Sequence, residues 1–247
     1  MLNLSKIIQF YISSCLLCSP FLLAHQVVFD GAPEEILPIL EEVSQLKQRS
    51  QEDELSLFQL QIRADADLIA IKEALQSHAY YAAEVKAYIE GSVVRFQITP
   101  GAIYRVQEIR IWDQKHDQEL KMDLVELSLG ELATAEQILL FERQLLNALH
   151  QQGFAKAVIL HRELLVDPER EGAYLHLVLQ MGEKYRFGDL RIQGRERTNV
   201  GFFEEKAPWH PGDLYDPRLI QQAQDKLELT GLFRSVRVAP ARENVEG

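Results

Sequence analysis

The chain has 247 residues, of which 47% are hydrophobic and 26% are charged, and its formal net charge at pH 7 is −11. This length suits either one medium-sized domain or several small ones. The acidic balance argues against a nucleic-acid partner, because phosphate groups need a basic surface, and beyond residue 24 no apolar run is long enough for a transmembrane helix.

The N-terminus has the features of a secretory signal peptide. Lys6 precedes an apolar run over 7–24 that ends in a small residue, so we assign residues 1–24 to a signal peptide. Both cysteines, Cys15 and Cys18, lie inside it, and its cleavage would leave no disulfide and no thiolate metal ligand. The residues before Cys15 also resemble a lipoprotein cleavage box, although the apolar run before that box is short.

The first predicted domain covers residues 25–101. Its patterns of apolar residues predict a strand at 26–30, helices at 33–46 and 65–77, and strands at 83–90 and 93–99. Glu90-Gly91-Ser92 predicts a tight hairpin between the last two strands. The order of elements is β-α-α-β-β.

The second predicted domain, residues 102–183, has the same order. The patterns predict a strand at 104–111, a helix at 118–129, a helix from 134 to 152, and strands at 155–166 and 173–180. Thr134 and Gln137 form a capping box at the start of the second helix. Ile138, Phe141 and Leu145 begin an apolar stripe on that helix, which we expect to pack on a sheet.

The third predicted domain, residues 184–247, contains too few elements. A strand is expected at 185–193, a short helix near 200–206, a helix at 217–230 capped by Asp216, and a strand at 234–240. A closing strand is missing from this pattern, and the remaining elements bury too little apolar surface to offset their ordering entropy. We therefore expect this domain to be incomplete unless another segment or chain supplies a strand, and the chain to be the front part of a longer protein.

An internal repeat supports the division into three domains. The residues of one copy return about 80 positions later, which suits an array of very small domains. The matching segments are Gly101-Ala-Ile-Tyr104-Arg105 with Gly182-Glu-Lys-Tyr185-Arg186, Gly130-Glu-Leu132 with Gly212-Asp-Leu214, and Ala79-Tyr80 with Gly153-Phe154 and Gly231-Leu232.

The repeated pattern resembles the POTRA domains of the BamA superfamily. Within it, the segments Gly182-Glu-Lys-Tyr185-Arg186-Phe187, Pro211-Gly212-Asp213-Leu214-Tyr215 and Thr230-Gly231-Leu232-Phe233 are most similar to the TamA family. The resemblance implies an α+β fold of tandem POTRA domains, each a mixed three-stranded sheet covered by two helices, with the third domain lacking its last strand. It also implies a place in the periplasm, attached to the outer membrane through a C-terminal β-barrel outside this sequence.

The resemblance further implies partners. Such domains hold unfolded outer-membrane or surface proteins and contact an inner-membrane TamB-like partner. Two other roles stay open from the same pattern: a membrane-anchored POTRA scaffold of a cell-envelope or division complex, and the arm of a two-partner secretion transporter.

Candidate binding residues follow from the expected sheet edges. In relatives of this fold the second strand is the free edge, and an edge offers unpaired N–H and C=O groups to an extended peptide. The alternative is that these strands are simply edges, blunted by their charged residues. The candidate residues are Glu84, Val85, Lys86 and Ala87 in the first domain, Val158, Ile159, Leu160 and His161 in the second, and Val236, Arg237 and Val238 in the third.

Four aromatic residues have candidate packing roles. Tyr104 and Tyr185 each begin a domain shortly after the preceding strand, so we expect them to pack between neighbouring domains, with ordinary strand packing as the alternative. Trp112 and Trp209 would suit recognition if exposed, but burial is favoured for both.

No motif in the sequence indicates catalysis. The seven histidines lack the i, i+4 spacing of a helical metal pair, and no nucleophile elbow, P-loop or dinucleotide fingerprint occurs. We therefore expect no enzyme activity, no catalytic residues, no metal and no cofactor.

Overall fold

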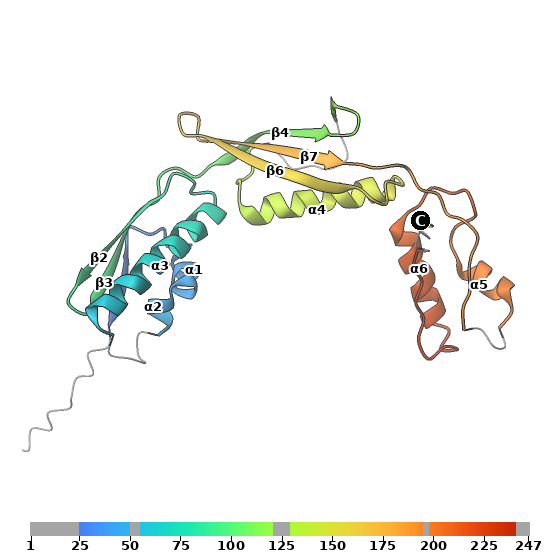
Figure 1. Cartoon of the computed structure of the whole chain (residues 1–247), viewed down its shortest axis with the longest axis horizontal. Helices are drawn as coiled ribbons and strands as arrows, with labels where there is room; N and C mark the ends of the chain where they lie inside the picture. The colour runs from blue at the N-terminus through green and yellow to red at the C-terminus, as the bar shows by residue number, and fades with distance from the viewer. Residues whose placement is uncertain (1–24, 50–54, 121–128, 195–197, 241–247) are drawn as a thin grey trace, which may run out of the picture. The chain divides into compact units, whose positions relative to one another are not determined.

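The computed structural model describes residues 25–49, 55–120, 129–194 and 198–240 (Figure 1). These residues divide into two compact units, one within Met1–Ile71 and Val85–Ile98, the other within Lys72–Glu84 and Thr99–Gly247. The predicted signal peptide lies outside the described residues, and the division into three domains stays a prediction.

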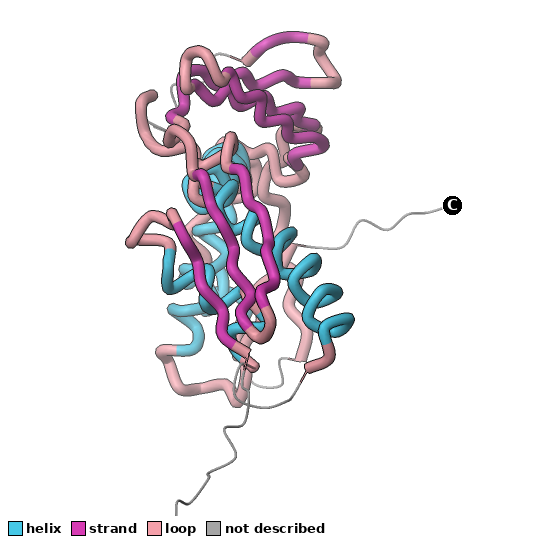
Figure 2. Tube along the Cα trace, turned by 90° about the vertical axis from the view of Figure 1, so that its left-hand side faces the viewer, coloured by secondary structure: helices cyan, strands magenta, loops and turns pink. Residues whose placement is uncertain are grey.

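The first sheet confirms the predicted fold class. Strand β1 runs parallel to β3, and β2 and β3 are neighbours joined by a two-residue turn, so the sheet is mixed with the order β1-β3-β2. The helices lie on one face of this sheet, which Figure 2 shows from the strand side. The elements are β1 (Gln26–Asp30), α1 (Leu37–Val43), α2 (Gln45–Gln48), α3 (Leu57–Ser77), β2 (Glu84–Glu90) and β3 (Val93–Thr99).

Two helix predictions for this part were wrong in detail. The predicted helix 33–46 is broken at Ser44, whose extended backbone lets its side chain cap α2 by accepting from Lys47 N. Helix α3 begins at Leu57, eight positions before the predicted start. Ser56 and Gln59 form a reciprocal capping box there, with Ser56 N donating to Gln59 Oε1 at 2.9 Å.

The second sheet has the order β5-β4-β7-β6, in which β4 is parallel to β7 and β6 is antiparallel to β7. Helix α4 covers one face of it. The apolar stripe of α4 is buried against Leu175, Leu177 and Leu179 of β7, as the sequence predicts. The elements are β4 (Arg105–Asp113), β5 (Gln118–Glu119), α4 (Ala135–Gln151), β6 (Val158–Asp167) and β7 (Gly172–Gln180).

The fourth strand of this sheet contradicts a prediction. Gln118 and Glu119 pair with Asp113 and Trp112 as the short strand β5 instead of starting a helix. The turn before them allows this pairing, because Asp117 adopts a left-handed backbone with φ of 49°. The rest of the predicted helix falls largely on 121–128, outside the described residues.

The third repeat contains the helices α5 (Val200–Lys206) and α6 (Pro217–Glu228), and no strand among its described residues. The strands predicted at 185–193 and 234–240 do not form, except for an isolated bridge between Arg186 and Leu214. The other two sheets explain why. In both, the closing strand lies between the first and the second strand, and no described residue of the third repeat takes that central position.

A small aromatic core holds the third repeat together. Phe187 stacks on Trp209 with ring centroids 4.6 Å apart, and Ala223 of α6 completes the buried cluster. The burial of Trp209 confirms the prediction for that residue. Trp112 in contrast is 41% exposed on β4, so the burial predicted for it was wrong.

Candidate functional site

Strands β2 and β6 each lie at an edge of their sheet. In β2 the candidate residues alternate, with Glu84 and Lys86 exposed and Val85 and Ala87 half-buried. In β6, Val158, Leu160 and His161 are exposed and Ile159 is half-buried. Both strands therefore have the edge position that partner binding requires, and the binding itself stays a prediction.

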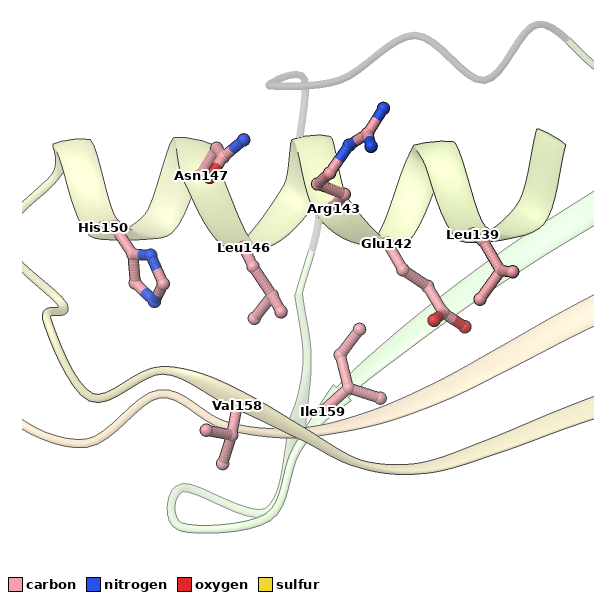
Figure 3. Close-up of a pocket in the computed structure, with 8 residues that line it drawn as sticks. All are labelled: Leu139, Glu142, Arg143, Leu146, Asn147, His150, Val158 and Ile159. Atoms are coloured by element: carbon pink, nitrogen blue, oxygen red, sulfur yellow. The ribbon is translucent and has the colours of Figure 1, made fainter. Parts of the chain in front are cut away.

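A groove runs between β6 and α4. It encloses about 520 Å³ and is lined by residues of these two elements, which Figure 3 shows. Leu146 and Leu139 point from α4 toward β6, and Ile159 points back toward the helix. The lining residues are Leu139, Glu142, Arg143, Leu146, Asn147 and His150 from α4, and Val158 and Ile159 from β6.

Four of the residues that line the groove are apolar and four are polar, and one of the polar ones, Glu142, takes part in an ion pair. Among its apolar lining residues, Leu139 is 53% exposed and Val158 is 45% exposed. Arg162 of β6 reaches across to α4, with its Nη1 3.2 Å from Oε1 of Glu142. This ion pair joins the strand to the helix beside the apolar residues of the groove.

A β-bulge interrupts the edge strand itself. The pairing of β6 with β7 shifts between Ile159 and His161, so Leu160 has no directly opposite residue. Bulges turn the backbone of an edge strand and blunt it against indiscriminate pairing. The regular part of the edge therefore runs from His161 to Asp167.

The third predicted edge is absent. Val236, Arg237 and Val238 belong to no strand, so assigning them to a free edge was wrong. Val238 packs beside the aromatic core of this repeat, and its N–H donates to Gln224 Oε1 of α6 at 3.2 Å. Without a neighbouring strand, the segment bonds to the helix side chain instead.

Tyr104 and Tyr185 make backbone contacts with residues that follow the preceding helix. Tyr104 is 1% exposed and its ring lies edge-on against Tyr81, with centroids 5.6 Å apart. Lys156 Nζ lies 5.3 Å from the centre of the Tyr185 ring, a cation–π contact. Burial raises the pKa of Tyr81 above its ordinary value, with a smaller opposing effect of Arg162, so its hydroxyl stays protonated and donates to Ala133 O.

Sequence reasoning did not find the groove. Leu139 lies outside the apolar stripe that packs α4 on the sheet, and Leu146 packs only partly buried against that core, so the periodicity of α4 does not mark them as groove residues. The two leucines can be recognised as groove residues only once β6 is known to run beside the helix. The pair of Glu142 and Arg162 could not be found either, because it joins elements that pack only in the folded chain.

The structure was also compared with the requirements of a metal site and of a membrane-spanning helix. Across the described ranges, no three histidine, aspartate or glutamate side chains gather closely enough to hold a metal ion. None of the helices in that part of the chain has the length and apolar character needed to cross a membrane.

No model of a known protein family matches the chain. Among solved structures it is similar to POTRA3–5 of BamA from Haemophilus influenzae, at 18% identity and a TM-score of 0.49, over 89% of this chain and 90% of that one. POTRA1–3 of the periplasmic domain of Omp85 from Anabaena gives 14% and 0.40, over 86% of each chain. CdiB from Escherichia coli gives 13% and 0.33, over 68% of this chain and 29% of that one. Because all these identities are below 25% and all these scores below 0.5, we infer the function from the site of this chain.

Proposed function

We propose that this chain is the periplasmic POTRA array of a TamA-like outer-membrane assembly protein, and that it captures extended polypeptides along its free sheet edges. The observation that carries the proposal is that β6 is an edge strand and lines a groove with α4. A strand added to β6 would form main-chain hydrogen bonds and place alternate side chains over Leu139 and Leu146.

The expected affinity is low. Each main-chain hydrogen bond contributes about 0.5–1.5 kcal/mol, so about four bonds give roughly 2–6 kcal/mol before the entropy of association is subtracted. Once that entropy is subtracted, binding at one edge is millimolar or weaker. Two edges, β2 and β6, in one chain would raise the overall affinity without holding a client permanently.

The proposal also names the partners and the place. The clients are unfolded outer-membrane or surface proteins, which are rich in alternating strands and so suit edge pairing. An inner-membrane TamB-like protein is the second partner, and the chain acts as a binding module without catalysis. The net charge of −11 favours clients and partners with basic segments.

Amide NMR spectra with a defined probe would test the capture step. The probe is a ten-residue peptide of alternating valine and threonine flanked by lysines, added at millimolar concentration to the purified chain. We expect the amide signals of residues 158–166 to shift, and Leu139→Asp to weaken binding about tenfold by placing a charge in the groove. Gln144→Asp adds the same charge on an exposed part of α4 that does not line the groove, and should leave binding unchanged.

The result that contradicts the proposal is equally specific. Shifts spread over exposed residues of both units, with no difference between Leu139→Asp and Gln144→Asp, would mean that the peptide adheres without using the edge.

A further inference from the structure

Helix α3 has two apolar faces. It lies in the layer of helices on the first sheet (Figure 1), where Leu60 and Ile71 of one face are 3% and 0% exposed. Phe58, Ile62 and Ile69 are in contrast 74%, 53% and 60% exposed. Because successive residues of an α-helix are turned by about 100°, these three side chains fall within roughly 40° of one another, opposite the buried face. We call these three residues the outer stripe.

The outer stripe has the composition of a second buried face. Single exposed apolar residues are normal on a protein surface, but three in line on one helix form a patch. A helix that covers a sheet normally turns polar residues away from the core. From Phe58 to Ile69 the stripe runs for about 17 Å, or three helical turns, which is the length of a contact with one other helix.

A carboxylate interrupts the outer stripe. Asp65 lies in line between Ile62 and Ile69 and is exposed. Its Oδ1 accepts a hydrogen bond from Gln61 Nε2, an uncharged group of the same helix, at 3.0 Å. A partner that covers the stripe must take this carboxylate out of water, which is costly unless a cation lies opposite it.

We propose that the outer stripe binds an amphipathic helix of another protein, and that the apolar face of that helix carries a lysine or arginine at its centre. Its apolar side chains pack between those of the stripe, and its cation lies against Asp65. This proposal goes beyond edge capture, because it uses no strand edge and because the outer stripe belongs to the other compact unit than β6.

The charge of Asp65 disfavours two other occupants. A second copy of this chain, laid helix on helix with the two stripes in contact, would bring two Asp65 carboxylates together at its centre, where they repel each other. The apolar run of residues 7–24 contains no lysine or arginine, so it has no cation for Asp65. A helix from another protein with a central cation satisfies both the apolar residues and the carboxylate.

The probe for the test is a synthetic helical peptide of about eighteen residues, or five turns. Leucines on one face have the spacing of the outer stripe, and a lysine stands in the middle of that face. The other faces carry alanine, glutamine and balanced pairs of glutamate and lysine. A fluorescent label measures its affinity for the purified chain, and amide NMR signals show where it binds. We expect shifts over residues 58–69.

Variants of the chain make the same kind of change on and off the stripe. Ile62→Gln and Ile69→Gln should each weaken binding roughly tenfold, because an apolar contact at the centre of the interface is lost. Leu57→Gln is the matched control and should leave binding unchanged. Leu57 is 67% exposed on the same helix but is turned about 100° away from Phe58. All three substituted side chains are exposed, so none of the changes removes a core contact.

The charge is tested separately from the apolar contacts. A second peptide with glutamate in place of the central lysine should bind the parent chain about tenfold more weakly. Asp65→Lys should reverse this preference, so that the glutamate peptide binds the more tightly.

Several outcomes would overturn the inference. These are equal affinities of the Ile62→Gln and Leu57→Gln chains, an unchanged preference in Asp65→Lys, or no binding at millimolar peptide. A dimer of the parent chain in sedimentation that Ile62→Gln abolishes would show that a second copy occupies the stripe. Shifts confined to residues 158–166 would also overturn this inference, while edge capture by β6 would stand.

Discussion

The buried carboxylate of Asp67 gives the sharpest prediction for the first compact unit. Its side chain on α3 accepts three hydrogen bonds, from Ser44 Oγ at 2.6 Å, from Gln45 N at 2.9 Å and from Leu46 N at 3.1 Å. Asp67 is 1% exposed, so no water can replace these bonds without a rearrangement. The substitution Asp67→Ala would leave two backbone N–H groups at the start of α2 without this acceptor, and that of Leu46 is buried.

The magnitude follows from these three bonds. Hydrogen bonds to a charged group contribute about 1.5–3 kcal/mol each, and they do not add fully when they share one acceptor group. We therefore expect Asp67→Ala to lower the free energy of unfolding by about 3–5 kcal/mol. A unit of about 70 residues has roughly 4–10 kcal/mol in total, so the variant would lose around half of its stability.

Amide hydrogen exchange is the suitable assay, because both tryptophans lie in the other unit and do not report on this one. The slow amides of β3, such as those of Val94 and Phe96, should exchange faster by a factor of at least a hundred. Asp65→Ala is the control, since Asp65 is an exposed residue of the same helix and accepts a hydrogen bond from Gln61 Nε2 at 3.0 Å. If both variants exchange at the parent rate, or if both exchange equally fast, the carboxylate does not hold α2 as we describe.

Three other features give further expected outcomes. Asp216→Ala should destabilise α6 by about 1 kcal/mol in hydrogen exchange, and Asp216→Asn by less, because asparagine still caps. Hydrogen bonding from the neighbouring arginine holds the pKa of Asp216 below its ordinary value, so its stabilising effect is present above about pH 4 and is lost as the pH falls through that lower pKa. Gly31→Ala should lower the denaturation midpoint far more than Gly91→Ala. Both glycines have positive φ, but only at Gly31 would a Cβ meet a backbone oxygen, at 2.3 Å. Leu149→Ala should cost about 2–5 kcal/mol in thermal unfolding, and the exposed Leu139→Ala under about 0.5 kcal/mol.

Each of these outcomes has a contrary one. Stability of α6 that stays constant down to pH 2 would remove the role given to Asp216. Equal midpoints for the two glycine variants would show that the strand backbone yields to the added methyl group. Equal thermal unfolding midpoints for Leu149→Ala and Leu139→Ala would mean that the apolar stripe of α4 does not form the core against the second sheet.

The elements that could be predicted are those whose signals are local. Alternation in β3 and β7, the capping residue Thr134 and the turn around Gly91 each act within a few residues of where they stand, and the structure has all of them. The internal repeat made the order of strands and helices predictable, because an element recognised in one copy identifies its counterpart in the next. The mixed sheets with helices on one face follow from that order.

The elements that failed depend on partners far away in the chain. The break at Ser44 is stabilised by a carboxylate more than twenty residues later, which no local pattern reveals. β5 exists because β4 offers it an edge. The strands expected at 185–193 and 234–240 have the composition of strands, but a strand needs a neighbour to satisfy its backbone. The late start given to α3 was avoidable, since Ser56 and Gln59 have the spacing of a capping box.

The bulge in β6 limits the length of a strand that could pair with this edge in one register. Because the pairing shifts at Leu160, an added strand can stay in register only along 161–167, which is about seven residues or roughly 23 Å of extended chain. A client longer than this must bend away or slip to a new register, and each slip of one residue turns its side chains to the opposite face. The proposed capture would therefore hold a client over short segments, and would select for alternation of its side chains rather than for a particular sequence.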